Sequence, residues 1–363
     1  MVLVEISNKA VGLVARFFEK IGLKTAINAF YNVKQIGRQV LYSALNRIAA
    51  EAASQLLKIR LPSNEVLSAD RILDYLHSLS SEKMQAELRA SIRQARNYAK
   101  QHYAQPVTVA IDFHEDQYYG DKNDLHVVGT QRKAGTNYAW RYITAEIVEE
   151  GKRLCIEALP VYSDDEKPII LAKVLNSVKR VVKIKQVLLD RGFYAVNCIF
   201  ELKKARVFFT MPVIKDSKMK KLVKEHRTEL PWIGTHTLGD KNAETFTVCL
   251  KRVDDEVHGF ATNKIFEGCG KKETEMFVNK ISNEYTSRWG VETGYRVKHF
   301  FHAKTTSPDH KIRTLYFFLS VILYNSWVLA NQVSEKKITV FLFNKLLENQ
   351  LVFTPTTPTT HPP

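Results

Sequence analysis

Residues 106–113, PVTVAIDF, mark the point where the sequence changes from a helical to a strand-like pattern. The segment is short, apolar and β-branched, which is typical of a buried strand. Three further strand-like segments follow, at residues 123–130, 138–150 and 152–162. Their order, with a turn at Glu150-Gly151, indicates strands of the antiparallel type.

Helices and strands then alternate. We expect a helix from about Pro168 to Lys185, a strand that ends at Asp190, a helix over residues 195–205 and a strand over residues 206–213. Antiparallel strands followed by this alternation predict a mixed α/β fold, in which helices cover the faces of one sheet. The ribonuclease-H-like fold is built in this order.

Composition divides the chain into five segments. They are an all-helical N-terminal domain (1–105), the first part of the core (106–213), a β-rich insertion (214–256), the second part of the core (257–335) and a C-terminal segment (336–363). The N-terminal domain is expected to bind DNA ends, and the alternative is a bundle for packing or dimerisation. The second part of the core holds a helix from about Glu273 through Phe300. The chain ends in a Thr/Pro tail that is expected to be extended and disordered.

The charge balance favours a polyanionic partner. The chain has 53 Lys and Arg against 38 Asp and Glu, a net charge of +15. Such a surface attracts nucleic acid or an anionic membrane. Two basic stretches, residues 173–185 and 215–227, are predicted to contact phosphates, although a run of charge is more often a solvated face.

The cysteines and the apolar segments restrict the compartment. The four cysteines form no CxxC motif, which favours a reducing environment over a disulfide framework. The first 20 residues do not resemble a secretory signal. The apolar stretch 315–330 is shorter than the roughly 20 residues that a bilayer needs, so a buried core helix is the better interpretation and no membrane is expected.

Two aspartates stand where predicted strands end. Asp112 ends VTVAID and Asp190 ends VLLD. If these strands are neighbours, both carboxylates emerge at the same edge of the sheet, where a divalent cation would offset their repulsion. Either aspartate taken alone is more often a turn residue or a helix N-cap.

A third group of polar residues lies in residues 285–299, YTSRWGVETGYRVKH. On an ideal helix Tyr285, Arg288 and Glu292 occupy positions i, i+3 and i+7 of one face. The simplest alternative is a solvated face on which Arg288 and Glu292 form an i,i+4 ion pair. That alternative explains neither Tyr285 nor the neighbouring Trp289.

These segments together resemble the DDE-class insertion-sequence transposases. Tyr285, Arg288 and Glu292 match the Tyr-x2-Arg-x3-Glu signature of that family, and AIDFHE and DRGFY resemble its two aspartate motifs. The resemblance extends over residues 107–331. The family also has a β-rich insertion between the second aspartate and the glutamate, and here that interval is 292 − 190 = 102 residues.

The resemblance implies a cut-and-paste DNA transposase with a ribonuclease-H-like catalytic domain. Asp112, Asp190 and Glu292 would be catalytic and would bind two Mg²⁺ ions, for which Mn²⁺ can substitute. The partners would be double-stranded DNA, as terminal inverted repeats and as target, and a second copy of the chain on that DNA. The expected location is the nucleoid of a prokaryotic cytoplasm.

Two other functions stay open at this point. A nuclease or resolvase on the same fold would cut DNA without strand transfer. A catalytically silent, transposase-derived protein would only bind DNA, and the three intact carboxylates argue against it.

The resemblance also implies DNA contacts. Tyr285, Arg288 and Arg191 would position phosphates, and Trp232 and Trp289 are candidates to stack on an unpaired base, unless these indoles are buried.

One position departs from the signature, which places a lysine seven residues after the glutamate. Position 299 is His, and Lys298 comes one residue early. With Glu292 at 0° on an ideal helix, Arg296 lies at about +40° and His299 at about −20°, whereas Lys298 lies near −120°. We therefore expect Arg296 to hold the phosphate, with a contribution from His299 when it is protonated. Lys298 is the alternative DNA-binding residue if the helix register is locally altered.

Overall fold

The computed structural model describes residues 2–21, 31–240 and 242–353, which form two compact units. The helical unit comprises Met1–Ala95, Tyr119–Lys122 and Gly294–Pro363, and the sheet unit comprises Arg96–Tyr118 and Asn123–Thr293. The Thr/Pro tail expected after residue 353 lies outside the described residues.

The helical unit is built from both ends of the chain. Its helices are α1 (Val2–Lys20), α2 (Val33–Asn46), α3 (Ala50–Arg60), the 3₁₀ turn η1 (Ser63–Glu65), α4 (Ala69–His77), most of α5 (Ser81–His102), the end of α10 (Trp289–His299), α11 (His310–Val333) and α12 (Val340–Phe353). Local capping defines several starts. Asn32 and Gln35 form a capping box at α2, and Ser68 caps α4.

Helix α11 is the core helix of this unit. It is long and apolar enough to cross a membrane by length and composition, but 78% of its most apolar window is buried. This burial confirms the core helix that the sequence predicted.

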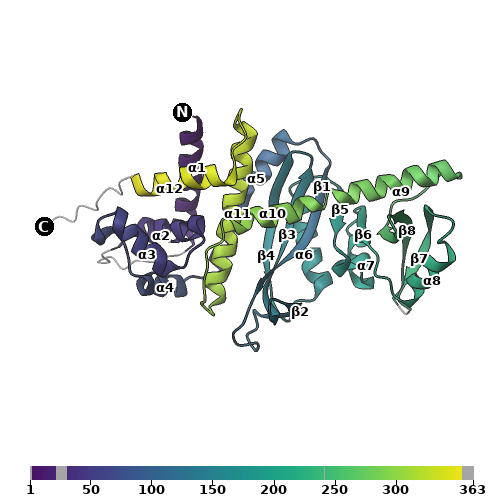
Figure 1. Ribbon diagram of the computed structural model, residues 1–363, viewed down its shortest axis with the longest axis horizontal. Coiled ribbons are helices and arrows are strands. Elements are labelled where there is room, and N and C mark those ends of the chain that lie inside the picture. Colours follow the sequence, from purple (N-terminus) through teal and green to yellow (C-terminus); the bar gives the residue numbers. More distant parts are fainter. Residues whose placement is uncertain (1, 22–30, 241, 354–363) are drawn as a thin grey trace. The chain divides into compact units, whose positions relative to one another are not determined.

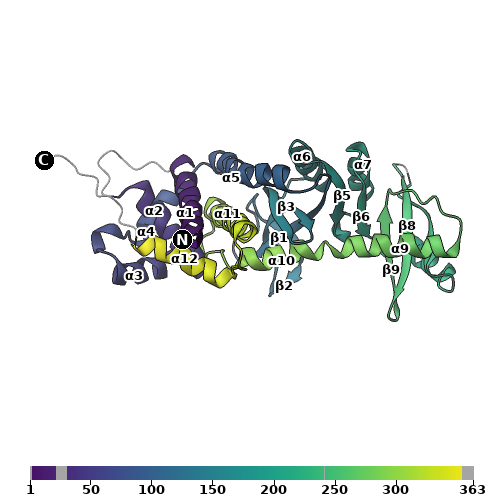
Figure 2. The same cartoon turned by 90° about the horizontal axis from the view of Figure 1, so that it is seen from above.

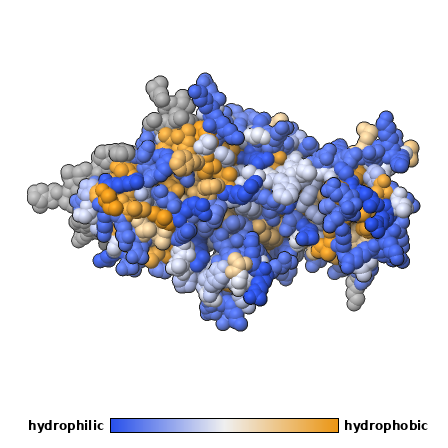
Figure 3. Space-filling view, in the orientation of Figure 1, coloured by the Kyte–Doolittle hydropathy of each residue, from blue (hydrophilic) through white to orange (hydrophobic). Residues whose placement is uncertain are grey.

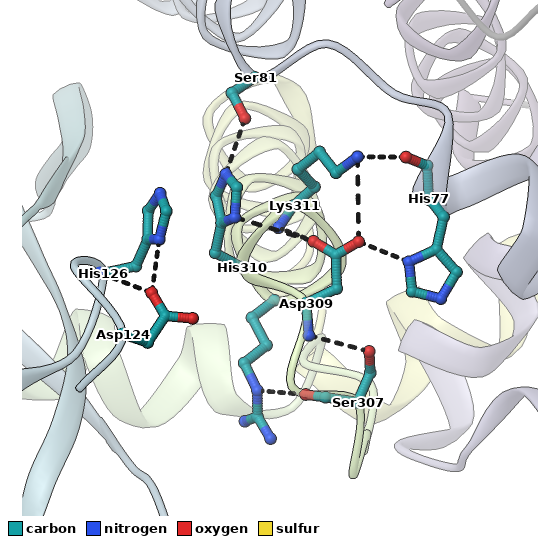
Figure 4. A network of polar contacts seen from close by, with 9 residues as sticks. His77, Ser81, Asp124, His126, Ser307, Asp309, His310 and Lys311 are labelled. Atoms are coloured by element: carbon teal, nitrogen blue, oxygen red, sulfur yellow. Dashed lines mark hydrogen bonds and ion pairs between the residues drawn. The ribbon is translucent and has the colours of Figure 1, made fainter. Parts of the chain in front are cut away.

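The start of α11 is fixed by polar contacts to α4 and α5 (Figure 4). The Asp309 side chain caps the helix by accepting a hydrogen bond of 2.7 Å from the Lys311 amide. Its other oxygen lies 2.5 Å from His77 Nδ1 at the end of α4. Ser81, the first residue of α5, lies 3.0 Å from His310 Nε2. These contacts hold segments that are more than 200 residues apart in sequence.

Part of the surface of the helical unit is apolar (Figure 3). Ile59 on α3 is 80% exposed and Phe341 on α12 is 73% exposed. Burying such side chains would stabilise an interface, so these helices offer a surface for protein contact.

The sheet unit contains one mixed sheet of nine strands. The strands are β1 (Val107–Gln117), β2 (Val128–Lys133), β3 (Thr136–Glu149), β4 (Lys152–Val161), β5 (Ile184–Leu189), β6 (Phe209–Pro212), β7 (Trp232–Leu238), β8 (Glu244–Val253) and β9 (Glu256–Thr262). The order is β2-β3-β1-β5-β6-β9-β8-β7, and β4 also pairs with β3 outside this order. Strand β5 is parallel to β1 and β6, and every other pair is antiparallel.

The helices of this unit lie on opposite faces of the sheet (Figures 1 and 2). Helices α6 (Lys167–Lys179) and α7 (Val196–Lys204) cover one face, and α9 (Lys271–Thr286) with the start of α10 runs along the other. A short helix, α8 (Ser217–Glu225), precedes β7. The mixed α/β fold with a helical N-terminal region is therefore confirmed.

One expected helix is shorter in the structure than predicted. The helix predicted from Pro168 to Lys185 ends at Lys179, because the β-branched residues that follow lead into β5, which pairs with β1 and β6. Its basic residues therefore do not form one helical face. Lys173 lies 3.7 Å from Asp165, and the Lys179 ammonium donates to the Ala205 carbonyl.

Candidate active site

Asp112 lies on β1, which is hydrogen-bonded to β3 on one side and to β5 on the other. Residues 107–112 are all buried, and Asp112 is only 8% exposed. Its Oδ1 accepts a hydrogen bond of 2.9 Å from the Phe113 amide. The continuous apolar run before it explains this burial, since both faces of β1 are covered.

Asp190 follows β5 directly, beside Asp112. Ile111 pairs with Leu189 in the parallel register, so the next residue of each strand is one of the two aspartates. The Asp190 side chain also caps the 3₁₀ turn η2 (Arg191–Phe193) by accepting from the Gly192 amide at 3.0 Å. The two carboxylates thus emerge at the same edge of the sheet, as the strand ends predicted.

An aromatic stack joins the two aspartate segments. The rings of Phe113 and Phe193 lie 4.8 Å apart with an interplanar angle of 6°. Each phenylalanine is one to three residues from an aspartate, so this contact holds η2 against β1. The motif match did not single out these rings. Their only sequence signal is an aromatic residue after each aspartate.

Glu292 reaches the same region through Arg288. The Arg288 guanidinium donates from Nη1 to Asp112 Oδ2 at 3.1 Å and from Nη2 to Glu292 Oε1 at 2.6 Å. The side chains of Arg288 and Asp112 are 13% and 12% exposed, and that of Glu292 is 39% exposed. A single guanidinium therefore joins carboxylates that are 180 residues apart.

The helix predicted from Glu273 through Phe300 is in fact two helices, α9 and α10. Between them, hydrogen bonds run to the third preceding residue: Arg288 to Tyr285 at 2.9 Å, Gly290 to Ser287 at 2.9 Å and Val291 to Arg288 at 2.8 Å. This is the tighter 3₁₀ pattern. The Thr286 hydroxyl donates to the Asn283 carbonyl at 2.5 Å, a local bond that competes with a regular helix.

Because of this break, Tyr285 does not lie on one continuous helical face with Arg288 and Glu292. Its ring packs on Phe260 with centroids 5.3 Å apart, and the Arg288 guanidinium lies 5.6 Å from its centre. Burial raises the pKa of Tyr285 to about 12. The ring of Tyr285 therefore packs against the Arg288 guanidinium on one side and belongs to the apolar cluster around Phe260 on the other.

The electrostatics of Asp112 are unusual for a carboxyl group. Burial raises its pKa most, the neighbouring Asp190 raises it further, and Arg288 lowers it, with a result of about 7. Both upward shifts express the cost of placing a negative charge here. A bound cation would offset that cost, and carboxylate oxygens are the ligands that hard divalent ions prefer.

The three carboxylates do not converge on one point among the described residues. Among the residues that the structure describes, no group of three or more His, Cys, Asp or Glu side chains lies close enough to hold a metal ion. Arg288 instead lies between Asp112 and Glu292. Asp112 and Asp190 still fit a divalent cation, because they provide adjacent oxygen donors in a site that disfavours uncompensated negative charge.

Gly290 allows α10 to approach the sheet. A Cβ atom at this position would lie 3.1 Å from Arg153 Nε and 3.2 Å from Val148 Cγ1. Gly290 lies between Arg288 and Glu292 but is not one of the residues of the Tyr-x2-Arg-x3-Glu signature. The available signal was a glycine inside an expected helix, which lowers helix propensity and so indicates a packing reason.

The other expected DNA contacts differ in exposure. Arg191 and Arg296 are exposed, and Trp289 is 62% exposed. Trp232 is half-buried and stacks on His226, with centroids 4.1 Å apart. The exposed indole of Trp289 is thus available for stacking, whereas Trp232 already has an aromatic neighbour.

Lys298 and His299 belong to the helical unit and make their contacts within it. Lys298 is only 3% exposed, and its ammonium lies 4.5 Å from the centre of the Tyr295 ring and 5.1 Å from that of Tyr324. His299 Nε2 lies 2.6 Å from Arg47 Nη2. The burial of Lys298 agrees with its calculated position away from the Glu292 face.

Comparison with known proteins gives a family and a fold. The family model described as "Transposase DDE domain" matches residues 104–326, more than half of the chain. The chain is similar to the piggyBac transposase in a cryo-EM synaptic complex with hairpin DNA, with a TM-score of 0.59 and 12% identity over 96% of this chain and 79% of that chain. A search of curated proteins finds no significant match.

Proposed function

Because the chain belongs to the transposase DDE domain family, whose members cut and join DNA with divalent metal ions, we propose that Asp112, Asp190 and Glu292 are its metal ligands. The observation that carries this assignment is the Arg288 bridge, which brings Glu292 to Asp112 beside Asp190. The raised pKa of Asp112 supports it, since a site that disfavours a buried negative charge is one that a cation would stabilise.

Two Mg²⁺ ions are the proposed metal, with Mn²⁺ as a substitute. When bound, they would activate water and stabilise the leaving 3′ oxygen. Glu292 can join the two aspartates only if Arg288 releases a carboxylate. The released guanidinium would then donate paired hydrogen bonds to a DNA phosphate, for which its planar shape is suited.

The experiment that tests the proposed function is an in vitro reaction with DNA from the ends of the element and Mg²⁺. Cleaved ends joined to target DNA would establish cut-and-paste transposition. Cleavage without joining would indicate a nuclease or resolvase, and binding alone would indicate a silent DNA-binding derivative. Inverted repeats that flank the coding sequence would provide the substrate.

We also propose the wider setting of this reaction. The substrates are double-stranded terminal repeats and target DNA in the nucleoid of a prokaryotic cytoplasm, and two copies of the chain act together on the DNA. The exposed apolar residues of α3 and α12, including Ile59 and Phe341, are suited to contact between the two copies.

Arg296 is proposed as the phosphate contact that replaces the signature lysine. Arg296 is exposed one helical turn beyond Glu292, whereas Lys298 is buried. We expect Arg296→Ala to weaken binding of element-end DNA by about tenfold and to slow strand transfer. The slope of log affinity against log salt concentration should fall in magnitude by about one, the value for one phosphate contact. Binding titrations at several salt concentrations measure the affinity and the slope.

Lys298→Met is the matched control for Arg296→Ala. It removes a buried charge between two tyrosine rings, so we expect a change in thermal stability without a change in the salt dependence of binding. If Arg296→Ala binds ends normally while a stably folded Lys298 variant does not, the phosphate contact belongs to Lys298.

The basic helix α8 is proposed as a second DNA contact. Lys218 and Lys221 have side chains that are 60% and 79% exposed, and Lys220 is also exposed. Reversing Lys218, Lys220 and Lys221 to Glu should weaken end binding at least tenfold at low salt and flatten its salt dependence. The same reversal at the exposed Lys336 and Lys337 should have a smaller effect. Unchanged affinity in the α8 variant would show that this helix is a solvated face.

A further inference from the structure

Lys264, just after β9, links two segments that carry proposed active-site residues. Its ammonium donates to Gln186 Oε1 at 2.7 Å and forms an ion pair with Glu284. Gln186 lies on β5 four residues before Asp190, and Glu284 lies on α9 one turn before Arg288. Neither the aspartate motifs nor the Tyr-x2-Arg-x3-Glu signature includes Lys264.

The three groups are removed from solvent. Gln186 is 2% exposed, and the side chains of Lys264 and Glu284 are 16% and 18% exposed. Hydrogen bonds between charged partners are short and strong when water is excluded. This contact is therefore more rigid than a surface ion pair, whose contribution is small.

The backbone around Lys264 is held as firmly as its side chain. The Lys264 carbonyl accepts a hydrogen bond of 3.1 Å from the Thr247 hydroxyl on β8. The side chain of the preceding Asn263 accepts from the Phe209 amide and donates to the Val207 carbonyl, both at 2.9 Å. Lys264 thus projects from a fixed point of the sheet toward α9.

We propose that Lys264 is a positioning residue of the active site, which sets the distance between the Asp190 segment and the segment after α9 that carries Arg288 and Glu292. This inference rests on the proposed metal-binding function. The end of α9 is only a few residues from Arg288, and the tight hydrogen bonds over residues 285–291 transmit its position to the start of α10. Loss of the tether would let the Glu292 segment move relative to Asp112 and Asp190. Misplacement by about 1 Å can cost a hundredfold in rate.

The decisive variant removes both charges, Lys264→Met with Glu284→Met. Removing only one partner would leave a buried charge unpaired and could unfold the protein, whereas an apolar pair of similar volume usually preserves stability. We expect this double variant to remain folded, with a melting temperature lower by about a few degrees because the buried Gln186 amide loses the Lys264 donor. We also expect about tenfold weaker binding of Mn²⁺, measured from the EPR signal of the free ion, and faster hydrogen exchange at residues 284–292.

Cleavage gives the second readout. The double variant should require about tenfold more Mg²⁺ for half-maximal cleavage, with unchanged affinity for end DNA. The single variant Lys264→Arg keeps the positive charge, so it should retain most of the metal affinity of the wild type. The matched control is Lys203→Met with Glu244→Met. That pair joins α7 to β8 at 2.6 Å on the same sheet, and its removal should leave Mn²⁺ binding unchanged.

The outcomes separate the two proposals. If the double variant is folded and binds Mn²⁺ as tightly as the wild type, the Lys264 contact does not position the metal ligands and the inference is wrong. If the double variant unfolds, the single variant Lys264→Gln takes its place, and unchanged Mn²⁺ affinity of that folded variant contradicts the inference equally. If Asp112→Asn binds Mn²⁺ and cleaves like the wild type, the assigned metal ligands are wrong instead.

Discussion

Asp112→Asn is expected to abolish cleavage of element-end DNA in Mg²⁺ while the affinity for that DNA stays within a few-fold of the wild type. Asp112 is the most buried of the three carboxylates and lies beside Asp190, so its replacement by an amide would remove an anionic oxygen from the residues that would hold the metal. We expect the cleavage rate to fall on the order of a thousandfold or more, because removing one member of a group of residues that act together removes most of the catalysis. Glu292→Gln should behave alike.

Gel analysis of labelled end DNA measures the cleavage, and a mobility-shift titration measures the binding. Asp164→Asn is the matched control, since Asp164 is an exposed aspartate of the same unit outside the site. It should cleave like the wild type. Normal cleavage by either Asp112→Asn or Glu292→Gln would remove these residues from the metal site.

Asp112→Asn is also expected to stabilise the metal-free protein at pH 8. The pKa of Asp112 is raised from 3.8 to about 7 in the folded state, so the folded protein binds the proton more tightly than the unfolded chain. The stability from the protonated group is fully present below about pH 4 and is lost as the pH rises to about 7. At pH 8 the ionised Asp112 carboxyl lowers the free energy of unfolding by at most ~4 kcal/mol.

The neutral amide avoids this cost at every pH. We expect Asp112→Asn to raise the melting temperature at pH 8 by about 3–8 °C, and by much less at pH 5, where the wild-type carboxyl is largely protonated. Mg²⁺ should raise the melting temperature of the wild type at pH 8 but not that of the variant. Differential scanning calorimetry with and without chelator measures both. An equal change at pH 5 and pH 8 would contradict the raised pKa.

Arg288 connects these two predictions. Its guanidinium forms ion pairs with Asp112 and Glu292 and so neutralises part of their charge. Metal binding would take over this role, and Arg288 would become free for phosphate. Under the proposed function, the same side chain would reduce repulsion between Asp112 and Glu292 before metal binds and would contact a DNA phosphate afterwards.

The sequence alone determined the fold class and the family. Each depends on local patterns: strand-like apolar runs that end in Asp112 and Asp190, the alternation of helix and strand, and the spacing of Tyr285, Arg288 and Glu292. The parallel pairing of β1 with β5 could also be expected, because it follows from the order of elements in a mixed sheet.

Only the tertiary structure decided how the side chains of the site meet. The break between α9 and α10, the Arg288 bridge and the burial of Lys298 depend on segments far away in the sequence, which no local periodicity encodes. The link from Lys264 to Gln186 and Glu284 joins residues 78 and 20 positions apart. Local propensity determines which helices and strands form. Which charged side chains become buried, and which groups they pair with, depends on how the elements pack, because packing decides which groups are shielded from water.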